Sequence, residues 1–188
     1  MRRAAVALLM AAVAAAGLWW GTYAVGGSDS YCYVAQAQAW ASGRLQTPEP
    51  LASAVPWPNG PTTFAPAGHI PSPTVPGAVA PICPSGLSVV MAPFVVADRL
   101  LGTGPPRADG RLVFAVVPLF GTLLVAAVYL VGSRYTPGVG LAAAALMACS
   151  PVFLFQLVQP MSDVPAAAMW GLALAGATSA RARGPLLA

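Results

Sequence analysis

The sequence predicts an all-α integral membrane protein with about four transmembrane helices and a long external first loop. Hydrophobic residues make up 57% of the chain and charged residues only 7%, whereas soluble domains carry about 25% charged residues. Apolar runs long enough to cross a bilayer recur along the sequence,. A segment rich in Pro, Gly, Ser and Thr separates the first run from the others. We therefore expect lipid to be the solvent for much of the chain.

The charged residues exclude a nucleic-acid-binding protein. The formal net charge is +4, and all nine cationic residues are Arg. These arginines lie beside apolar runs and do not cluster with aromatic residues, as they would at a nucleic-acid interface. Arginines beside apolar runs are typical of the signals that orient transmembrane helices. We therefore expect the lipid bilayer as a partner, and no nucleic acid.

The first apolar run covers residues 4–25, and Arg2 and Arg3 precede it. Its length of about 22 residues is enough to cross a hydrocarbon core of about 30 Å at 1.5 Å per residue. A cleaved signal peptide is the alternative, since the small residues at 14–16 offer a cleavage site,. We favour an uncleaved transmembrane helix, because the apolar run is longer than the about 7–15 apolar residues of a signal peptide.

A polar loop follows at residues 26–110. A short helix is predicted within it at residues 33–40, ended by Gly43. Residues 48–76 contain too much proline for a helix or for a central strand of a sheet,. We expect this stretch to be irregular but ordered, because apolar residues recur in it.

One apolar run inside the loop decides the topology. Residues 87–97 form a run of about 11 residues that is interrupted by Pro93, which is short for a span. We therefore predict a helix near residues 86–101 that lies against the outer membrane face. The alternative is that this run crosses the bilayer, which gives five spans and reverses the orientation of everything after it.

Three further transmembrane helices are predicted after the loop, at residues 112–132, 137–158 and 164–180,. Pro118 is a candidate kink position in the first of them. The many Gly and Ala residues of the other two suit close helix packing in lipid,.

With four spans, the amino terminus lies in the cytoplasm together with Arg134, Arg181 and Arg183. The protein is then a multi-pass protein of the plasma membrane. All five acidic residues face outward in this arrangement: Asp29, Glu49, Asp98, Asp109 and Asp163.

The three cysteines show no metal-binding spacing,. Cys149 lies in an apolar run and is interpreted as a packing residue. Cys32 and Cys83 fall in the same external loop and can form a disulfide in an oxidising compartment. We favour two free thiols, because a disulfide requires a geometry that the sequence does not reveal.

Asp29 is the first candidate for chemistry. It follows the first span and a Gly-Gly pair, close to Tyr31, Tyr33 and Trp40. A carboxylate partly desolvated by these aromatic residues would suit a general base. The alternative, which the local pattern by itself favours, is that Ser28 or Asp29 caps a helix beginning near Tyr31.

Asp163 has the same two interpretations, since Ser162 and Asp163 precede Pro165 at the start of a predicted span,. Four spans place Asp163 and Asp29 on one side of the membrane, where two acids can share a divalent metal ion or flank a phosphate–sugar bond. Arg44 is a candidate to hold a phosphate by its guanidinium fork, or else a solvated charge. His69 is a second candidate to bind the donor phosphate or a metal ion, or else a structural histidine.

Three stretches, taken in order, resemble the amino-terminal part of membrane glycosyltransferases of the GT-C fold, which use lipid-linked sugar donors. This group includes the protein mannosyltransferases and the aminoarabinose transferases of lipid A. The stretches are residues 27–31 with 35–44, residues 81–87, and residues 159–165.

The resemblance implies a transfer of a sugar from a polyprenyl-phosphate donor to an acceptor at the external membrane face. Asp29 would be the catalytic base, and Asp163 would bind the donor phosphate or a divalent metal ion. The chain departs from the family in having no Lys and a single acid at position 29. It is also shorter than such enzymes, so we expect an amino-terminal fragment. A non-catalytic membrane module or remnant, and a transporter fragment, are the alternatives.

Overall fold

The computed structural model of the chain describes residues 2–102 and 111–181. Asp109 and Arg183, to which the sequence assigns sides of the membrane, lie outside the described residues. The chain divides into two compact units. We call Met1–Thr22 with Phe114–Ala188 the bundle unit, and Tyr23–Val113 the loop unit.

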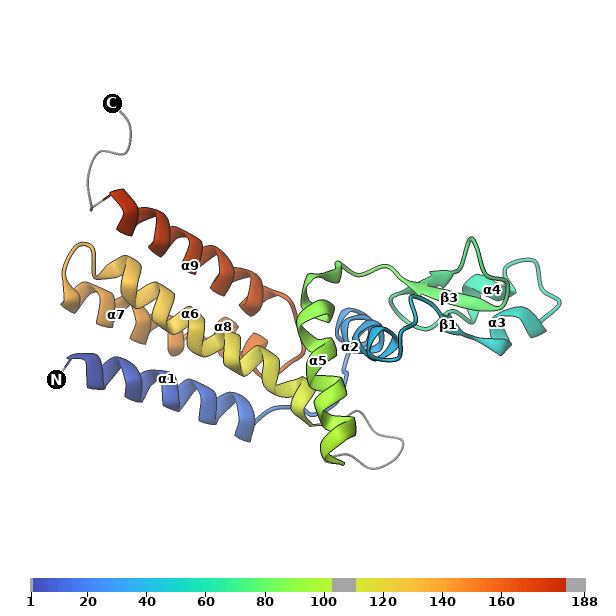
Figure 1. Cartoon of the computed structure of the whole chain (residues 1–188), viewed down its shortest axis with the longest axis horizontal. Helices are drawn as coiled ribbons and strands as arrows, with labels where there is room; N and C mark the ends of the chain where they lie inside the picture. Colours follow the sequence, from blue (N-terminus) through green and yellow to red (C-terminus); the bar gives the residue numbers. More distant parts are fainter. Residues whose placement is uncertain (1, 103–110, 182–188) are drawn as a thin grey trace. The chain divides into compact units, whose positions relative to one another are not determined.

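The bundle unit consists of helices packed around α6 (Figure 1). α6 contacts α1, α7 and α9 along its length. The helices are α1 (Arg2–Trp19), α6 (Val116–Gly132), α7 (Pro137–Ala148), α8 (Pro151–Leu157) and α9 (Asp163–Arg181). The 3₁₀ turn η1 (Leu112–Ala115) leads into α6.

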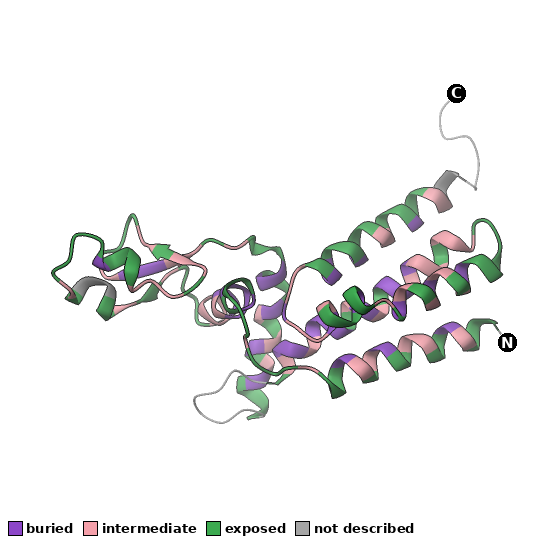
Figure 2. Ribbon diagram, turned by 180° about the vertical axis from the view of Figure 1, so that it is seen from behind, coloured by how far each residue is buried: buried purple, intermediate pink, exposed green. Residues whose placement is uncertain are grey.

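Small residues bring the bundle helices close together, as the sequence predicts. A Cβ atom at Gly17 of α1 would lie 2.8 Å from the Pro118 side chain of α6. At Gly140 of α7 it would lie 2.6 Å from the carbonyl oxygen of Tyr129. Gly138 is different, because only Thr136 lies near it. Figure 2 shows the resulting contrast between the buried faces of α6 and the exposed outer faces of α1 and α9.

Two described helices are long and apolar enough to cross a membrane, namely Arg2–Trp19 and Leu112–Gly132. The count rises to three if α7 and α8 form one broken span. These helices make the chain consistent with a membrane protein. α9 is not among them, since Asp163 in its first turn and Thr178 and Ser179 near its end make it less apolar.

Three details of the predicted spans are wrong. The first run is helical only to Trp19, and Tyr23 has a positive φ of 45°. Pro118 does not interrupt α6, because it lies in the first turn, where no intrahelical donor is lost,. The run at 137–158 is not one helix, because α7 and α8 meet at an angle of 64°. Pro151 explains this bend, since the residue before a proline is pushed out of the helical region.

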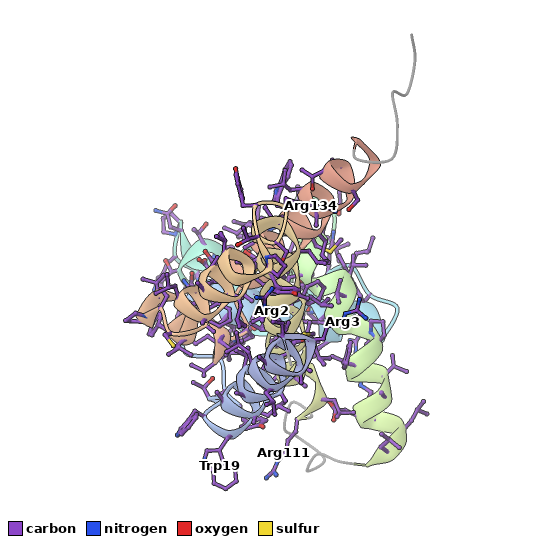
Figure 3. All side chains as sticks on the ribbon, turned by 90° about the vertical axis from the view of Figure 1, so that its left-hand side faces the viewer. Arg2, Arg3, Trp19, Arg111 and Arg134 are labelled. Atoms are coloured by element: carbon purple, nitrogen blue, oxygen red, sulfur yellow. A yellow bond between two sulfur atoms is a disulfide. The ribbon has the colours of Figure 1, made fainter. Side chains whose placement is uncertain are left out.

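Cationic residues gather at one end of the bundle unit. Arg2 and Arg3 begin α1, and Arg134 lies in the turn between α6 and α7 at the same end (Figure 1, Figure 3). The Arg134 guanidinium donates a hydrogen bond to the Ser179 hydroxyl of α9. Trp19 lies at the opposite end of α1 and is 81% exposed.

The loop unit combines two longer helices with a small sheet, so the all-α prediction is too narrow. The helices are α2 (Ser28–Ala41), α3 (Pro50–Ala54), α4 (Gly60–Thr63) and α5 (Ser85–Leu101). The strands are β1 (Thr47–Pro48), β2 (His69–Pro71) and β3 (Ala78–Pro81). They form an antiparallel sheet in the order β1-β3-β2.

Proline does not prevent these elements, because of where it stands. Pro48 and Pro71 lie on the two edge strands, and Pro81 ends the central strand. These are the places where a strand tolerates a residue without an N–H group. In α3 and α4, Pro lies in the first turn, where it costs no hydrogen bond,. The prediction of an irregular stretch at 48–76 is therefore wrong in part.

α2 and α5 pack against each other and form the core of the loop unit. The predicted helices at 33–40 and 86–101 are confirmed by them, and α2 is longer than predicted. The Ser88 hydroxyl, fully buried, donates a 3.0 Å hydrogen bond to the carbonyl oxygen of Tyr33. Asp98 is also buried, and its carboxylate accepts hydrogen bonds from the backbone N–H groups of Leu112 and Val113.

A disulfide joins Cys32 of α2 to Cys83, which corrects the favoured interpretation of two free thiols. The two Cα atoms lie 6.0 Å apart, within the normal range for a disulfide,. The geometry arises because β3 carries the chain back beside α2 before α5 begins. Cys149, in the bundle unit, is a free cysteine and is exposed rather than packed.

Candidate functional site

A polar cavity of about 280 Å³ lies within the loop unit, beside one face of α2. It is the place where the unit brings chemically capable side chains together from distant parts of the sequence. Its polar and charged lining includes Tyr31, Gln38, Arg44, Glu49, His69 and Arg99. Two of these residues, Arg44 and His69, are predicted from the sequence as site residues.

The carboxyl end of α2 positions both arginines. α2 ends at Ala41, and Gly43 has a φ of 68°, a left-handed conformation that glycine adopts without strain,. The turn brings Arg44 back so that its N–H donates to the carbonyl oxygen of Ala39. Arg99 of α5 donates from Nη1 to the carbonyl oxygen of Ala41 at 3.1 Å. A cation there satisfies carbonyl groups that the helix leaves unpaired and complements the helix dipole.

His69 is held by a tight turn. Its Nδ1 lies 3.0 Å from the carbonyl oxygen of Ala67. In the neutral ring this contact assigns the proton to Nδ1 and leaves Nε2 as an acceptor. The ring of Tyr31 lies 5.6 Å from the His69 ring, centroid to centroid. Tyr31 and His69 therefore form an aromatic wall of the cavity.

Gly68 makes this turn possible, and its replacement by Ala is expected to destabilise the loop unit by about 2–5 kcal/mol. Its φ is 74°, which costs an L-residue about 1–2 kcal/mol,. A Cβ atom would also lie 2.6 Å from the Cβ of Cys32, adding overpacking of about 1–3 kcal/mol,. Hydrogen exchange of the α2 amides measures the change.

Gly43→Ala is the matched control for this prediction. Gly43 has a similar φ of 68°, but a Cβ atom added there would have no neighbour within 4 Å. It should lose only the backbone contribution of about 1–2 kcal/mol. Equal losses in the two variants would show that the close approach of Gly68 to Cys32 contributes nothing.

The cavity is electrostatically positive, since two arginines and one glutamate line it. Glu49 is half-buried, whereas Arg44 and Arg99 are exposed. Among the described residues, the side chains of Arg44 and Glu49 form no hydrogen bond or ion pair with each other or with other groups. Both therefore remain free to bind a ligand.

Asp29 does not line this cavity. The cavity face of α2 carries Tyr31, Ala35, Gln38 and Ser42. At 100° per residue, Asp29 falls about 150° around the helix from the centre of that face. The loop unit therefore brings Arg44 and His69 together but leaves Asp29 on another side of α2.

Asp29 is exposed in the first turn of α2, so the expected desolvation by aromatic residues is not present. Its carboxylate accepts a hydrogen bond from the Ser28 hydroxyl. It is not the N-cap either, and nor is Ser28. The N-cap is Gly27, whose N–H donates to the Ser30 hydroxyl.

Asp163 belongs to the bundle unit, where it is the exposed first residue of α9. Ser162 precedes the helix, and its carbonyl oxygen accepts the N–H of Ala166. The predicted start of a helix at this position is confirmed. The predicted role of Asp163 in binding a phosphate or a metal ion stays a prediction.

Sequence reasoning did not assign four of the six polar and charged residues to a site, namely Tyr31, Gln38, Glu49 and Arg99. In the sequence, all three strands lie between Arg44 and Arg99, and Glu49 has no motif around it. The one local indication is the Asp98-Arg99 pair at the end of an apolar run. This pair predicts the polar end of α5 but does not indicate that Arg99 contacts α2.

Within residues 2–102 and 111–181, no three His, Cys, Asp or Glu side chains come together to hold a metal ion. Comparisons with protein-family models, with curated proteins and with solved structures give no match. The function must therefore be argued from the residues themselves.

Proposed function

We propose that the chain acts in a membrane glycosyltransferase reaction that uses a polyprenyl-phosphate sugar at the external membrane face. The observation that carries the proposal is the position of Asp29. Its carboxylate is exposed in the first turn of the helix that follows the first candidate span. A base there is open to water-soluble groups while the span anchors the chain in lipid.

In this proposal Asp29 removes the proton from an acceptor hydroxyl. The acceptor oxygen then forms a bond to the anomeric carbon of the sugar, with inversion, and the bond from that carbon to the lipid phosphate breaks. The phosphate leaves with the electron pair.

Two further observations support placing the loop unit outside the cytoplasm. The Cys32–Cys83 disulfide belongs to oxidising compartments, because cytosolic thiols are kept reduced,. The second observation is that one end of the bundle unit carries Arg2, Arg3 and Arg134 (Figure 3). Short segments rich in Arg are retained in the cytoplasm. The four-span arrangement, with α9 as the fourth span in the plasma membrane, satisfies both.

Sidedness can be tested by cysteine labelling in intact cells, in a Cys149→Ala background. A membrane-impermeant maleimide should label Asn59→Cys in the loop unit and Ser162→Cys before α9. Arg134→Cys should react only after the membrane is permeabilised. Asn59 is exposed and lies away from the disulfide, so it reports position without disturbing the fold.

Labelling of Asn59→Cys together with Arg134→Cys, but not of Ser162→Cys, would favour five spans over four. Absence of labelling at Asn59→Cys until permeabilisation would place the loop unit in the cytoplasm. That result would remove the external site on which the proposed reaction depends.

A further inference from the structure

The polar cavity of the loop unit is separate from the position of Asp29. We propose that it binds a small hydroxyl-rich anion, with the chemistry of a sugar phosphate. The proposal does not depend on glycosyl transfer, because Asp29 does not line the cavity.

The charge of the cavity favours an anion. Arg44 offers a guanidinium with its donors uncommitted among the described residues, and it is exposed at the cavity. A guanidinium fork matches the oxygen atoms of a phosphate or a carboxylate. Arg99 adds a second positive charge, which is held in place by the carbonyl oxygens of Ala41 and Gln38. Since these carbonyls and the helix dipole offset part of the charge of Arg99, Arg44 is the principal anion contact.

The other lining groups favour hydroxyl groups on the same ligand. The uncommitted carboxylate of Glu49 accepts hydrogen bonds but cannot donate them, so it requires donors such as hydroxyls,. Nε2 of His69 is likewise an acceptor when Nδ1 carries the proton toward Ala67,. A bare phosphate would satisfy Arg44 and be repelled by Glu49. A phosphate attached to a ring of hydroxyls satisfies both.

The size and the wall of the cavity agree with one sugar ring. About 280 Å³ corresponds to the volume of roughly nine water molecules at about 30 Å³ each,. This is room for one monosaccharide inside the cavity. The tilted rings of Tyr31 and His69 supply an apolar surface against which the C–H face of a sugar can lie,.

The binding test uses the purified full chain in lipid nanodiscs and isothermal titration calorimetry. The probes are glucose 6-phosphate, glucose and inorganic phosphate. Glucose 6-phosphate should bind at least tenfold more tightly than either of the others. Arg44→Gln should weaken its binding by at least tenfold. Arg111→Gln, which removes an exposed arginine of the same unit outside the cavity, should leave binding unchanged.

Glu49→Gln tests whether the cavity recognises the hydroxyl groups of the ligand or only its negative charge. It removes a negative charge, so inorganic phosphate should bind as well as before or better. The preference for glucose 6-phosphate over inorganic phosphate should fall several-fold, because the hydroxyl acceptor is weakened. A preference that is unchanged in Glu49→Gln would overturn the assignment of the hydroxyl groups to this carboxylate.

A lipid headgroup and a free sugar phosphate present the same chemistry, and two types of nanodisc distinguish them. In phosphatidylcholine discs the soluble probe has no competitor. If phosphatidylinositol in the discs weakens the binding of glucose 6-phosphate to the wild-type chain, the cavity accepts a lipid headgroup. If the binding of glucose 6-phosphate is unchanged, the ligand of the cavity is a soluble sugar phosphate. Failure of glucose 6-phosphate to bind in phosphatidylcholine discs, or equal binding by Arg44→Gln, would overturn the proposal.

Asp29→Asn distinguishes this inference from the proposed function. The variant should bind glucose 6-phosphate like the wild-type chain, whether or not it transfers sugar. If Asp29→Asn abolished binding while the loop unit stayed folded, the cavity would not be a separate site.

Discussion

Asp29→Asn is expected to lower glycosyl transfer by about 10²–10⁴-fold while the protein stays folded. Asn has the shape of Asp but cannot accept a proton, so it removes a general base and little else. Asp29 is exposed in the first turn of α2, and the hydroxyl of the adjacent Ser28 donates a hydrogen bond to it. The measurement is transfer from a radiolabelled polyprenyl-phosphate sugar in membranes that contain the wild-type or variant protein at equal amounts.

Ser28→Ala is the control for this variant. It removes the hydroxyl that donates to Asp29 and keeps the carboxylate, so transfer should fall only several-fold. If Asp29→Asn retained near-normal transfer, Asp29 would be a first-turn charge that stabilises α2 by about 0.3–1 kcal/mol. The main chemical support for the enzyme would then be lost, and a non-catalytic membrane module would be the better description.

Removal of the disulfide by Cys32→Ala with Cys83→Ala is expected to destabilise the loop unit by about 2–4 kcal/mol. The bond links residues that are 51 positions apart, and a closed loop of this size restricts the unfolded chain strongly,. The double variant avoids an unpaired thiol. Because the chain has two units, the change should be read locally, as faster hydrogen exchange in α2 and α5,.

Cys149→Ala is the matched control, because Cys149 is an exposed free cysteine of the bundle unit. Its removal should change stability by no more than about 0.5 kcal/mol. Exchange in α2 and α5 that is as slow in the double variant as in the wild-type protein would show that the disulfide adds nothing to the packing of these helices. Faster exchange confined to α3 and α4 would lead to the same conclusion.

The helices were largely predictable from sequence, because their causes are local. The run before Asp98 has a polar end and a continuous apolar face, and it forms α5 as expected. Gly43 marks the end of α2 by its left-handed conformation. The bend at Pro151 also has a local cause, although the length of the surrounding apolar run concealed it.

The sheet, the disulfide and most of the cavity could not be predicted, because they depend on contacts between distant segments. Arg99 reaches the carbonyl oxygen of Ala41 across 58 positions of the sequence. Cys83 reaches Cys32 only because β3 passes beside α2. Asp29 and Arg44 lie on one short helix and its following turn, yet they face different sides.

During biosynthesis, the sheet of the loop unit cannot begin to form until its last strand has been made. β3 is the partner of both β1 and β2, although it follows them in the chain. A nascent chain that ends before Ala78 therefore has strands with nothing to pair with. The segment can stay extended during synthesis, and it gains its tertiary structure only after β3 has been made.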